Sequence, residues 1–165
     1  MSRDLIEDYL NTHLQLVQSV ERLTEEQLKW KQEPGSWSVT EVLTHLADHN
    51  IVVSFRIRDI LADTKAQLPA FNQDSWITGQ HANEGNAADV LRVFGSLLQY
   101  NSLLFARLSD SDWNKSGINF KGESVNITAI IQGFTAHVQR HLAQIERIKA
   151  AAAVAATSAT APNVH

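Results

Sequence analysis

One stretch of this chain, residues 130–148, limits the possible folds more than any other, and it reads IIQGFTAHVQRHLAQIERI. Its apolar residues recur at helical spacing, at Ile130, Phe134, Ile145 and Ile148. Continuing that spacing between them reaches His137 and His141. Two imidazoles therefore lie in the stripe that a helix would turn toward a protein core. Burying these rings costs free energy unless their nitrogens find a partner, so the stretch predicts a metal ion or a hydrogen-bond network.

A second pair of histidines lies in a helix that we expect over residues 39–64. Ser38 followed by Glu41 forms a capping box and marks its start. His45 and His49 are four residues apart, so they lie one above the other on a helix. Periodicity places His49 nearer the centre of the apolar face and His45 on its flank. Spacing alone does not choose between them, and two half-exposed surface histidines would give the same pattern.

Three further helices are expected over residues 3–23, 86–108 and 126–149, each with an apolar stripe. In the first of these, His13 falls in a gap of the stripe, which is typical of a core or rim histidine with one hydrogen bond. Asn86 with Asp89 caps the next helix, and Gly95 within it permits close packing against a neighbour.

The connections differ in length and composition. Thr24 and Gln27 can cap a short helical turn before the Pro34-Gly35 turn, which Trp30 and Trp37 flank. Residues 65–85 predict a long crossover with one helical turn, whose aromatic residues could line a pocket, and His81 reads as a surface loop residue there. Between the third and fourth long helices, alternation over residues 115–122 is too weak to predict a strand.

Four amphipathic helices with polar connections predict an all-α four-helix bundle, because each stripe must be buried against others. The long crossover between the second and third helices permits those two to run parallel. We expect one domain, residues 1–150, followed by an Ala-rich tail, residues 151–165, whose first part prolongs the last helix. His165 is taken as a chain end and not as a ligand.

Composition excludes several function classes. The formal charge is −4 and the basic residues are scattered among acids, so we expect no nucleic-acid partner. The start MSRDLIEDYL lacks a basic leader with an apolar run, and no segment has the roughly 18 continuous apolar residues of a membrane span. These features predict a cytoplasmic protein without membrane contact. The chain has no cysteine, so any thiol chemistry must take its sulfur from a small molecule.

The histidine spacing suits a metal ion. Two histidines four residues apart on a helix point the same way, and one imidazole from another helix would complete a three-ligand set with positions left open. Three protein ligands with an open position are the usual catalytic pattern. An all-histidine set favours zinc, nickel, iron, cobalt or copper over magnesium or calcium.

Three segments carry a resemblance to a known family. WSVTEVLTHLADHN (residues 37–50), LTEEQLKWKQEPGSW (23–37) and HVQRHLAQI (137–145) resemble the DinB-like superfamily, also described as DinB/YfiT-like metalloenzymes. The similarity extends from the first helix to about Lys149. It implies a four-helix bundle in up-down-down-up order and a divalent metal, with zinc or nickel as the first candidates.

The resemblance also implies ligands. Carried over by motif, they are His45, the first histidine of THLADHN, and His137 with His141 of the last helix. This choice disagrees with the periodicity, which favoured His49. We follow the motif, because helical wheels err near bundle ends. His49 and Asp48 then become residues of the pocket around the metal, and Asp48, His49 and Glu123 are the positional candidates for a general base.

The activities that the resemblance implies are thiol transfer or isomerisation with bacillithiol, mycothiol or glutathione, and hydrolysis. We therefore expect a metal-dependent enzyme that transfers a low-molecular-weight thiol to a small-molecule electrophile. The alternatives are a metal-dependent hydrolase and a noncatalytic metal-binding stress-response module. An open metal position beside the crossover aromatics would favour an enzyme, whereas a fourth protein ligand such as His49 would oppose one. A homodimer formed through an exposed helix face is also expected.

Overall fold

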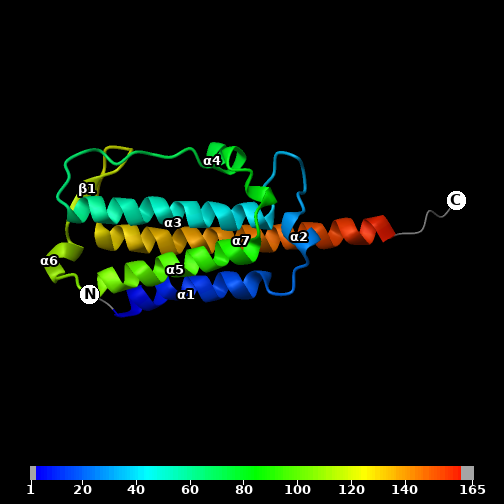
Figure 1. Cartoon of the computed structure of the whole chain (residues 1–165), viewed down its shortest axis with the longest axis horizontal. Coiled ribbons are helices and arrows are strands. Elements are labelled where there is room, and N and C mark those ends of the chain that lie inside the picture. Colours follow the sequence, from blue (N-terminus) through cyan, green and yellow to red (C-terminus); the bar gives the residue numbers. More distant parts are fainter. Residues whose placement is uncertain (1–2, 161–165) are drawn as a thin grey trace.

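Four long helices form the body of the protein (Figure 1). The computed structural model describes residues 3–160. The long helices are α1 (Arg3–Val20), α3 (Val39–Leu61), α5 (Ala87–Phe105) and α7 (Ile127–Thr160). In Figure 1, α3 and α5 run in one direction and α1 and α7 in the other. The predicted up-down-down-up bundle is confirmed.

Short elements fill the connections. They are α2 (Glu25–Lys29), α4 (Gln73–Gly79), the 3-10 helix η1 (Ala82–Glu84), α6 (Asp110–Trp113), β1 (Ser116–Ile118) and β2 (Ser124–Asn126). The crossover over residues 65–85 passes along α3 and carries α4 and η1 back to the end of the bundle where α5 begins (Figure 1). This return path allows α3 and α5 to run parallel.

Side-chain caps begin the helices where the sequence predicts them. The Ser38 hydroxyl accepts the Glu41 amide, and the Glu41 carboxylate accepts the Ser38 amide, which completes a capping box. Thr24 and Gln27 form the same arrangement before α2. Asn86 caps α5 by accepting the Asp89 amide. Each cap satisfies backbone donors that a helix start leaves unpaired.

Three helix ends differ from the expected ones. The first helix ends at Val20 and not at Leu23, because the Val20 carbonyl accepts the amides of both Arg22 and Leu23 and turns the chain toward α2. The second ends at Leu61, since Asp63 is left-handed (φ 60°) and reverses the backbone. The third ends at Phe105, close to the Ser109 cap of α6.

The fourth long helix continues beyond the expected end at Lys149 through the Ala-rich segment to Thr160. Alanine is the strongest helix former, so this extension needs little tertiary support. Its last residues are exposed and project past the bundle (Figure 1). The expected end residue His165 lies outside the described residues.

A two-stranded sheet lies where the sequence allowed a small extended piece over residues 115–122 but was too weak in alternation to predict a strand. β1 and β2 pair antiparallel with Gly117 opposite Val125. Strands of three residues are too short to show alternation. Their position is fixed by tertiary contacts, because Gly117 is buried against Ile60 of α3 and the Ile118 carbonyl accepts the Leu68 amide at 2.7 Å.

Replacing Gly117 by alanine is expected to destabilise the protein by about 1–3 kcal/mol, because the new Cβ would overpack the core. That Cβ would lie 2.7 Å from Ile60 Cγ1, too close for two carbons. Urea unfolding of Gly117→Ala tests this. In an Ile60→Ala background the added cost should vanish, and an equal cost in both backgrounds would contradict the contact.

The core is mainly apolar and contains a polar network around Asn101. Tyr9, Phe94 and Phe134 pack together, with the ring centroids of Tyr9 and Phe134 5.1 Å apart and those of Phe94 and Phe134 6.0 Å apart. The buried Asn101 amide donates to the Tyr9 hydroxyl and to Ser54 Oγ, and its carbonyl accepts from Arg58. These bonds tie α1, α3 and α5 together. None of the helices over residues 3–160 is long and apolar enough to cross a membrane.

Candidate metal centre

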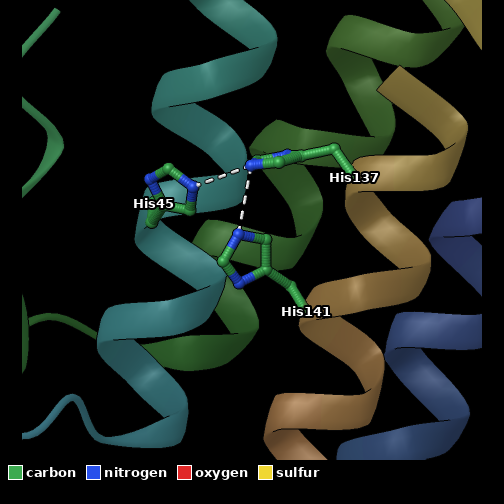
Figure 2. Close-up of side chains that lie close together, drawn as sticks. All are labelled: His45, His137 and His141. Carbon is green, nitrogen blue, oxygen red and sulfur yellow. Dashed lines mark hydrogen bonds between the residues drawn. The ribbon is translucent and has the colours of Figure 1, made fainter. Parts of the chain in front are cut away.

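Three imidazoles from two helices converge between α3 and α7 (Figure 2). His45 Nε2 lies 3.3 Å from His137 Nε2, and His141 Nε2 lies 3.1 Å from the same atom. One nitrogen from each ring lies within 4.8 Å of the other two. Within residues 3–160, this is the one group of three or more histidine, cysteine or acidic side chains with such spacing. The helical spacing of His137 and His141 places them on one face of α7, and α3 supplies the third ring.

The spacing of these nitrogens fits ligation of one ion. Zinc–nitrogen bonds of about 2.0–2.1 Å place two ligand nitrogens about 2.9 Å apart in octahedral and about 3.3 Å apart in tetrahedral geometry. The observed 3.1 and 3.3 Å fall in this range. Figure 2 draws both contacts as hydrogen bonds, each of which requires a proton on one of its two nitrogens, and a metal ion bound among the rings would take the place of such protons.

The second nitrogen of each ring, Nδ1, points away from the other two rings and shows how each ring is held. His141 Nδ1 lies 2.7 Å from Gln144 Oε1, an acceptor, so the Nδ1 proton is donated and the Nε2 lone pair faces the cluster. The Nδ1 atoms of His45 and His137 are buried without a hydrogen-bond partner. A hydrogen-bonded cluster alone would leave these buried polar atoms uncompensated, whereas binding an ion offsets that cost.

His45, and not His49, joins the cluster. His45 is 1% exposed, whereas His49 is half-buried, so periodicity was wrong to place His49 nearer the core. His49 stacks on Phe134, with centroids 5.7 Å apart, and lies against His137 with centroids 4.0 Å apart. It therefore lies beside the cluster but is not one of the three residues whose ligand atoms lie within 4.8 Å of one another.

Two aromatic side chains cover the cluster from outside the bundle. Trp37 contacts His45 with ring centroids 5.1 Å apart and stacks on His141 with centroids 6.5 Å apart. Phe71, from the crossover, stacks on His45 at 6.2 Å and lies 6.4 Å from His49. The crossover thus lies over the site, and these rings cover part of it, while His137 and His141 are half-buried.

Burial keeps the imidazoles neutral. It lowers the pKa of His45 to about 4, of His49 to about 3 and of His137 to about 2. Neighbouring imidazoles add to each effect, because two of them cannot be protonated together without repulsion, and Arg140 adds to the shifts of His49 and His137. Burial also lowers the pKa of His141, while its bond to Gln144 opposes the shift. Neutral imidazoles offer the lone pairs that a metal requires.

The sequence matches the DinB superfamily over residues 10–145. The chain belongs to this superfamily. A protein of Oceanobacillus iheyensis named "putative metal-dependent hydrolase" is 25% identical over 86% of this chain and 79% of its own length. A Bacillus licheniformis protein of the same name is 26% identical over 75% of this chain and 71% of its own length.

Two solved structures share the fold of this DinB-superfamily chain. YfiT from Bacillus subtilis, described as a probable metal-dependent hydrolase with an unusual four-helix bundle topology, superposes with a TM-score of 0.80. It is 19% identical, and the match covers 90% of this chain and 87% of YfiT. The mycothiol-dependent maleylpyruvate isomerase has a TM-score of 0.69 at 8% identity, over 86% of this chain and 59% of the isomerase.

The other candidate residues lie at various distances from the cluster of this DinB-superfamily protein. The Asp48 carboxylate accepts a 2.6 Å hydrogen bond from Gln80, and burial raises its pKa. The Glu123 carboxylate accepts a hydrogen bond from Asn119 in the hairpin turn, and this hairpin packs on Ile60 at the end of α3 that is far from His45. His13 packs against Gly95 and stacks on Phe94, and His81 is an exposed residue before η1. Glu123 is therefore not placed to act as a base at the cluster.

Sequence reasoning missed Gln144 and the role of Trp37. Gln144 follows His141 by three residues, which is the spacing that lets two helical side chains meet. That spacing could have identified Gln144. Nothing in the sequence places Trp37 over two histidines that lie up to 104 positions away, because this contact depends on how α3 and α7 pack.

Proposed function

We propose that this protein is a metal-dependent enzyme acting on a small molecule, with His45, His137 and His141 as the ligands of one divalent transition metal. The observation that carries the proposal is the convergence of their three Nε2 atoms at 3.1 and 3.3 Å. The names of the two sequence relatives support metal dependence. Zinc and nickel are the first candidates, since both accept imidazole ligands, as iron, cobalt and copper also do.

The residues around the ligands have separate tasks. A bound ion would supply Lewis acidity and lower the pKa of a coordinated water or thiol. Gln144 orients His141, and Trp37 and Phe71 cover part of the site, which limits the access of bulk water and so strengthens electrostatic interactions within it. Because His49 is not among the three grouped ligands, we expect a metal position to stay open for water or substrate, as an enzyme requires.

Transfer of a low-molecular-weight thiol to an electrophile is the first candidate reaction. The chain has no cysteine of its own. Near the cluster, Asp48 already accepts a bond from Gln80, and the pKa of His49 is lowered to about 3. With its pKa lowered this far, His49 is a weak base, and the Asp48 carboxylate is engaged by Gln80; a thiol that binds a metal needs little help to lose its proton. The structural likeness to a mycothiol-dependent isomerase agrees with this reaction.

Hydrolysis is the second candidate, and it is favoured by the names of the relatives. Water has a higher pKa than a thiol, so hydrolysis would benefit from a base. Asp48, whose pKa burial raises, is better suited to this role than His49, which contacts His137 but has its pKa lowered to about 3. A noncatalytic metal-binding module is the remaining alternative.

An activity screen distinguishes the three. Zinc-loaded and nickel-loaded protein would be incubated with glutathione, bacillithiol or mycothiol and a panel of electrophiles, and separately with esters and amides. We expect thiol-dependent conjugation that a chelator abolishes. Ester or amide cleavage without any thiol dependence would favour hydrolysis, and no turnover in either panel would favour the noncatalytic module.

Replacing Gln144 by leucine is expected to weaken metal binding about 10-fold to 100-fold, because His141 loses the bond that orients its ring. Competition with a chromophoric chelator measures this affinity. The matched control is Gln139→Leu, since Gln139 lies on the same helix but binds Gln15. Equal affinity in the wild type and the Gln144 variant would show that the bond plays no part in ligation.

A further inference from the structure

A cleft lies between α7 and the loop that precedes α3, beside the candidate metal centre. Its volume is about 340 Å³, and Gln32, Ser36, Trp37, Gln144, Arg147 and Ile148 line it. This volume is within the usual range for small-molecule sites. The cleft combines an apolar wall, made by Trp37 and Ile148, with amide, hydroxyl and guanidinium groups.

Two residues of the cleft also contact the metal centre. Trp37 stacks on His141, with ring centroids 6.5 Å apart, and contacts His45 at 5.1 Å. Gln144 lies 2.7 Å from His141 Nδ1. The cleft and the histidines are therefore separated by one layer of side chains. A molecule that reacts at the metal centre could extend along Trp37 into this cleft.

The cleft carries an unneutralised positive charge. Arg147 is exposed, and it has no hydrogen bond or ion pair with the described residues 3–160. Arg140 lies two turns before it on α7, so that Arg140, Gln144 and Arg147 follow helical spacing along one side. The nearby Glu146 is instead paired with Lys149 and Ser19 toward α1. Positive charge therefore collects on this side of a protein whose formal net charge is −4.

We propose that this cleft binds a carboxylate-bearing small molecule, with Arg147 pairing the carboxylate and Trp37 and Ile148 holding the adjacent apolar body. The inference rests on the proposed function, because it assigns a substrate class to the same site. Arginine binds carboxylates in a bidentate manner, which supplies orientation as well as affinity. Gln32 and Ser36 add hydrogen-bonding groups at the rim. The carboxylate belongs either to the thiol or to its electrophilic partner.

Binding to the metal-free protein tests the proposal independently of any activity. The probe is hexanoate, which has an apolar chain and one carboxylate, and its neutral counterpart is hexanamide. NMR follows the indole N–H of Trp37, which is assigned by comparison with Trp37→Phe. We expect saturable shifts with hexanoate and at least about tenfold weaker binding of hexanamide and of hexanoate to Arg147→Gln, as loss of a charged hydrogen bond implies. Arg107→Gln, at the far end of α5, is the matched control.

Other outcomes overturn the assignment. They are the absence of a saturable hexanoate shift, equal binding of hexanamide, or equal hexanoate affinity in the wild type and Arg147→Gln. A titration with glutathione identifies the source of the carboxylate. If glutathione binds and its binding depends on Arg147, the carboxylate belongs to the thiol. If hexanoate binds and glutathione does not, the carboxylate belongs to the electrophile. Because no metal is present in these titrations, failure here leaves the ligand proposal intact, and failure of the metal analysis leaves this result intact.

Discussion

Replacing His137 by alanine is expected to reduce the metal content of the purified protein from about one ion per chain to nearly none. His137 is chosen because its Nε2 lies next to the Nε2 atoms of both His45 and His141. Its loss leaves two nitrogens on different helices, which together hold an ion far less tightly than three. Elemental analysis of protein purified without added metal measures this change, and activity should fall with the metal.

The controls separate ligation from folding. His45→Ala should lose metal as His137→Ala does. His81→Asn should keep it, because His81 is an exposed left-handed residue at which asparagine is tolerated. Added zinc should raise the Tm of the wild type and of His81→Asn, since an ion that binds only the folded state stabilises it. Equal metal content in the wild type and both alanine variants would rule out the three-histidine site.

Acid is expected to destabilise the metal-free protein strongly between pH 7 and pH 5. In the folded state, burial lowers the pKa of His45, His49 and His137 to about 4, 3 and 2, whereas the unfolded value is 6.5. Below pH 6.5 the unfolded chain therefore takes up protons that the folded chain does not, and stability falls as the pH decreases toward the folded values.

The size of this loss of stability depends on how many protons the unfolded chain takes up and the folded chain does not. A single fully buried histidine costs at most about 1.4 kcal/mol per pH unit in this window. Solvent reaches part of His49 and His137 and screens their charges, which limits the total loss to about 2–4 kcal/mol at pH 5. Asp48, whose pKa is raised by burial, has the opposite dependence and offsets part of the loss.

Urea unfolding at pH 7 and pH 5 measures the loss. His49→Phe provides the matched variant, because a phenyl ring fills similar space against Phe134 and does not titrate. It should lose less stability between the two pH values than the wild type does. A wild type equally stable at both values, or a variant with the same loss, would show that the imidazoles are not held neutral by burial.

Much of the fold follows from local signals in the sequence. The capping boxes at Thr24 and Ser38 and the cap at Asn86 place three helix starts at the predicted residues. The ends are less predictable. Asp63 stops α3 by adopting a left-handed conformation, and the residue type alone does not show that it will do so. The hairpin depends on contacts of Gly117 and Leu68 with distant residues, which local alternation cannot show.

The candidate site shows the same division. Helical spacing brings His137 and His141 to one face of α7, and this could be predicted from the sequence alone. The choice of His45 over His49 could not, because residues four apart differ by only about 40° around a helix and both rings contact His137 of α7. The motif resemblance selected His45, and the structure brings it to the other two rings. That the three bind a metal remains a prediction.

Anomalous diffraction at the metal edge, from crystals of zinc-loaded protein, tests the central claim most directly. We predict one strong peak between α3 and α7, bonded to the Nε2 atoms of His45, His137 and His141, with at least one further position occupied by solvent. His49 should remain unbound. A peak at another site, no peak among these rings, or a fourth bond to His49 that closes the set would contradict the proposed open metal centre.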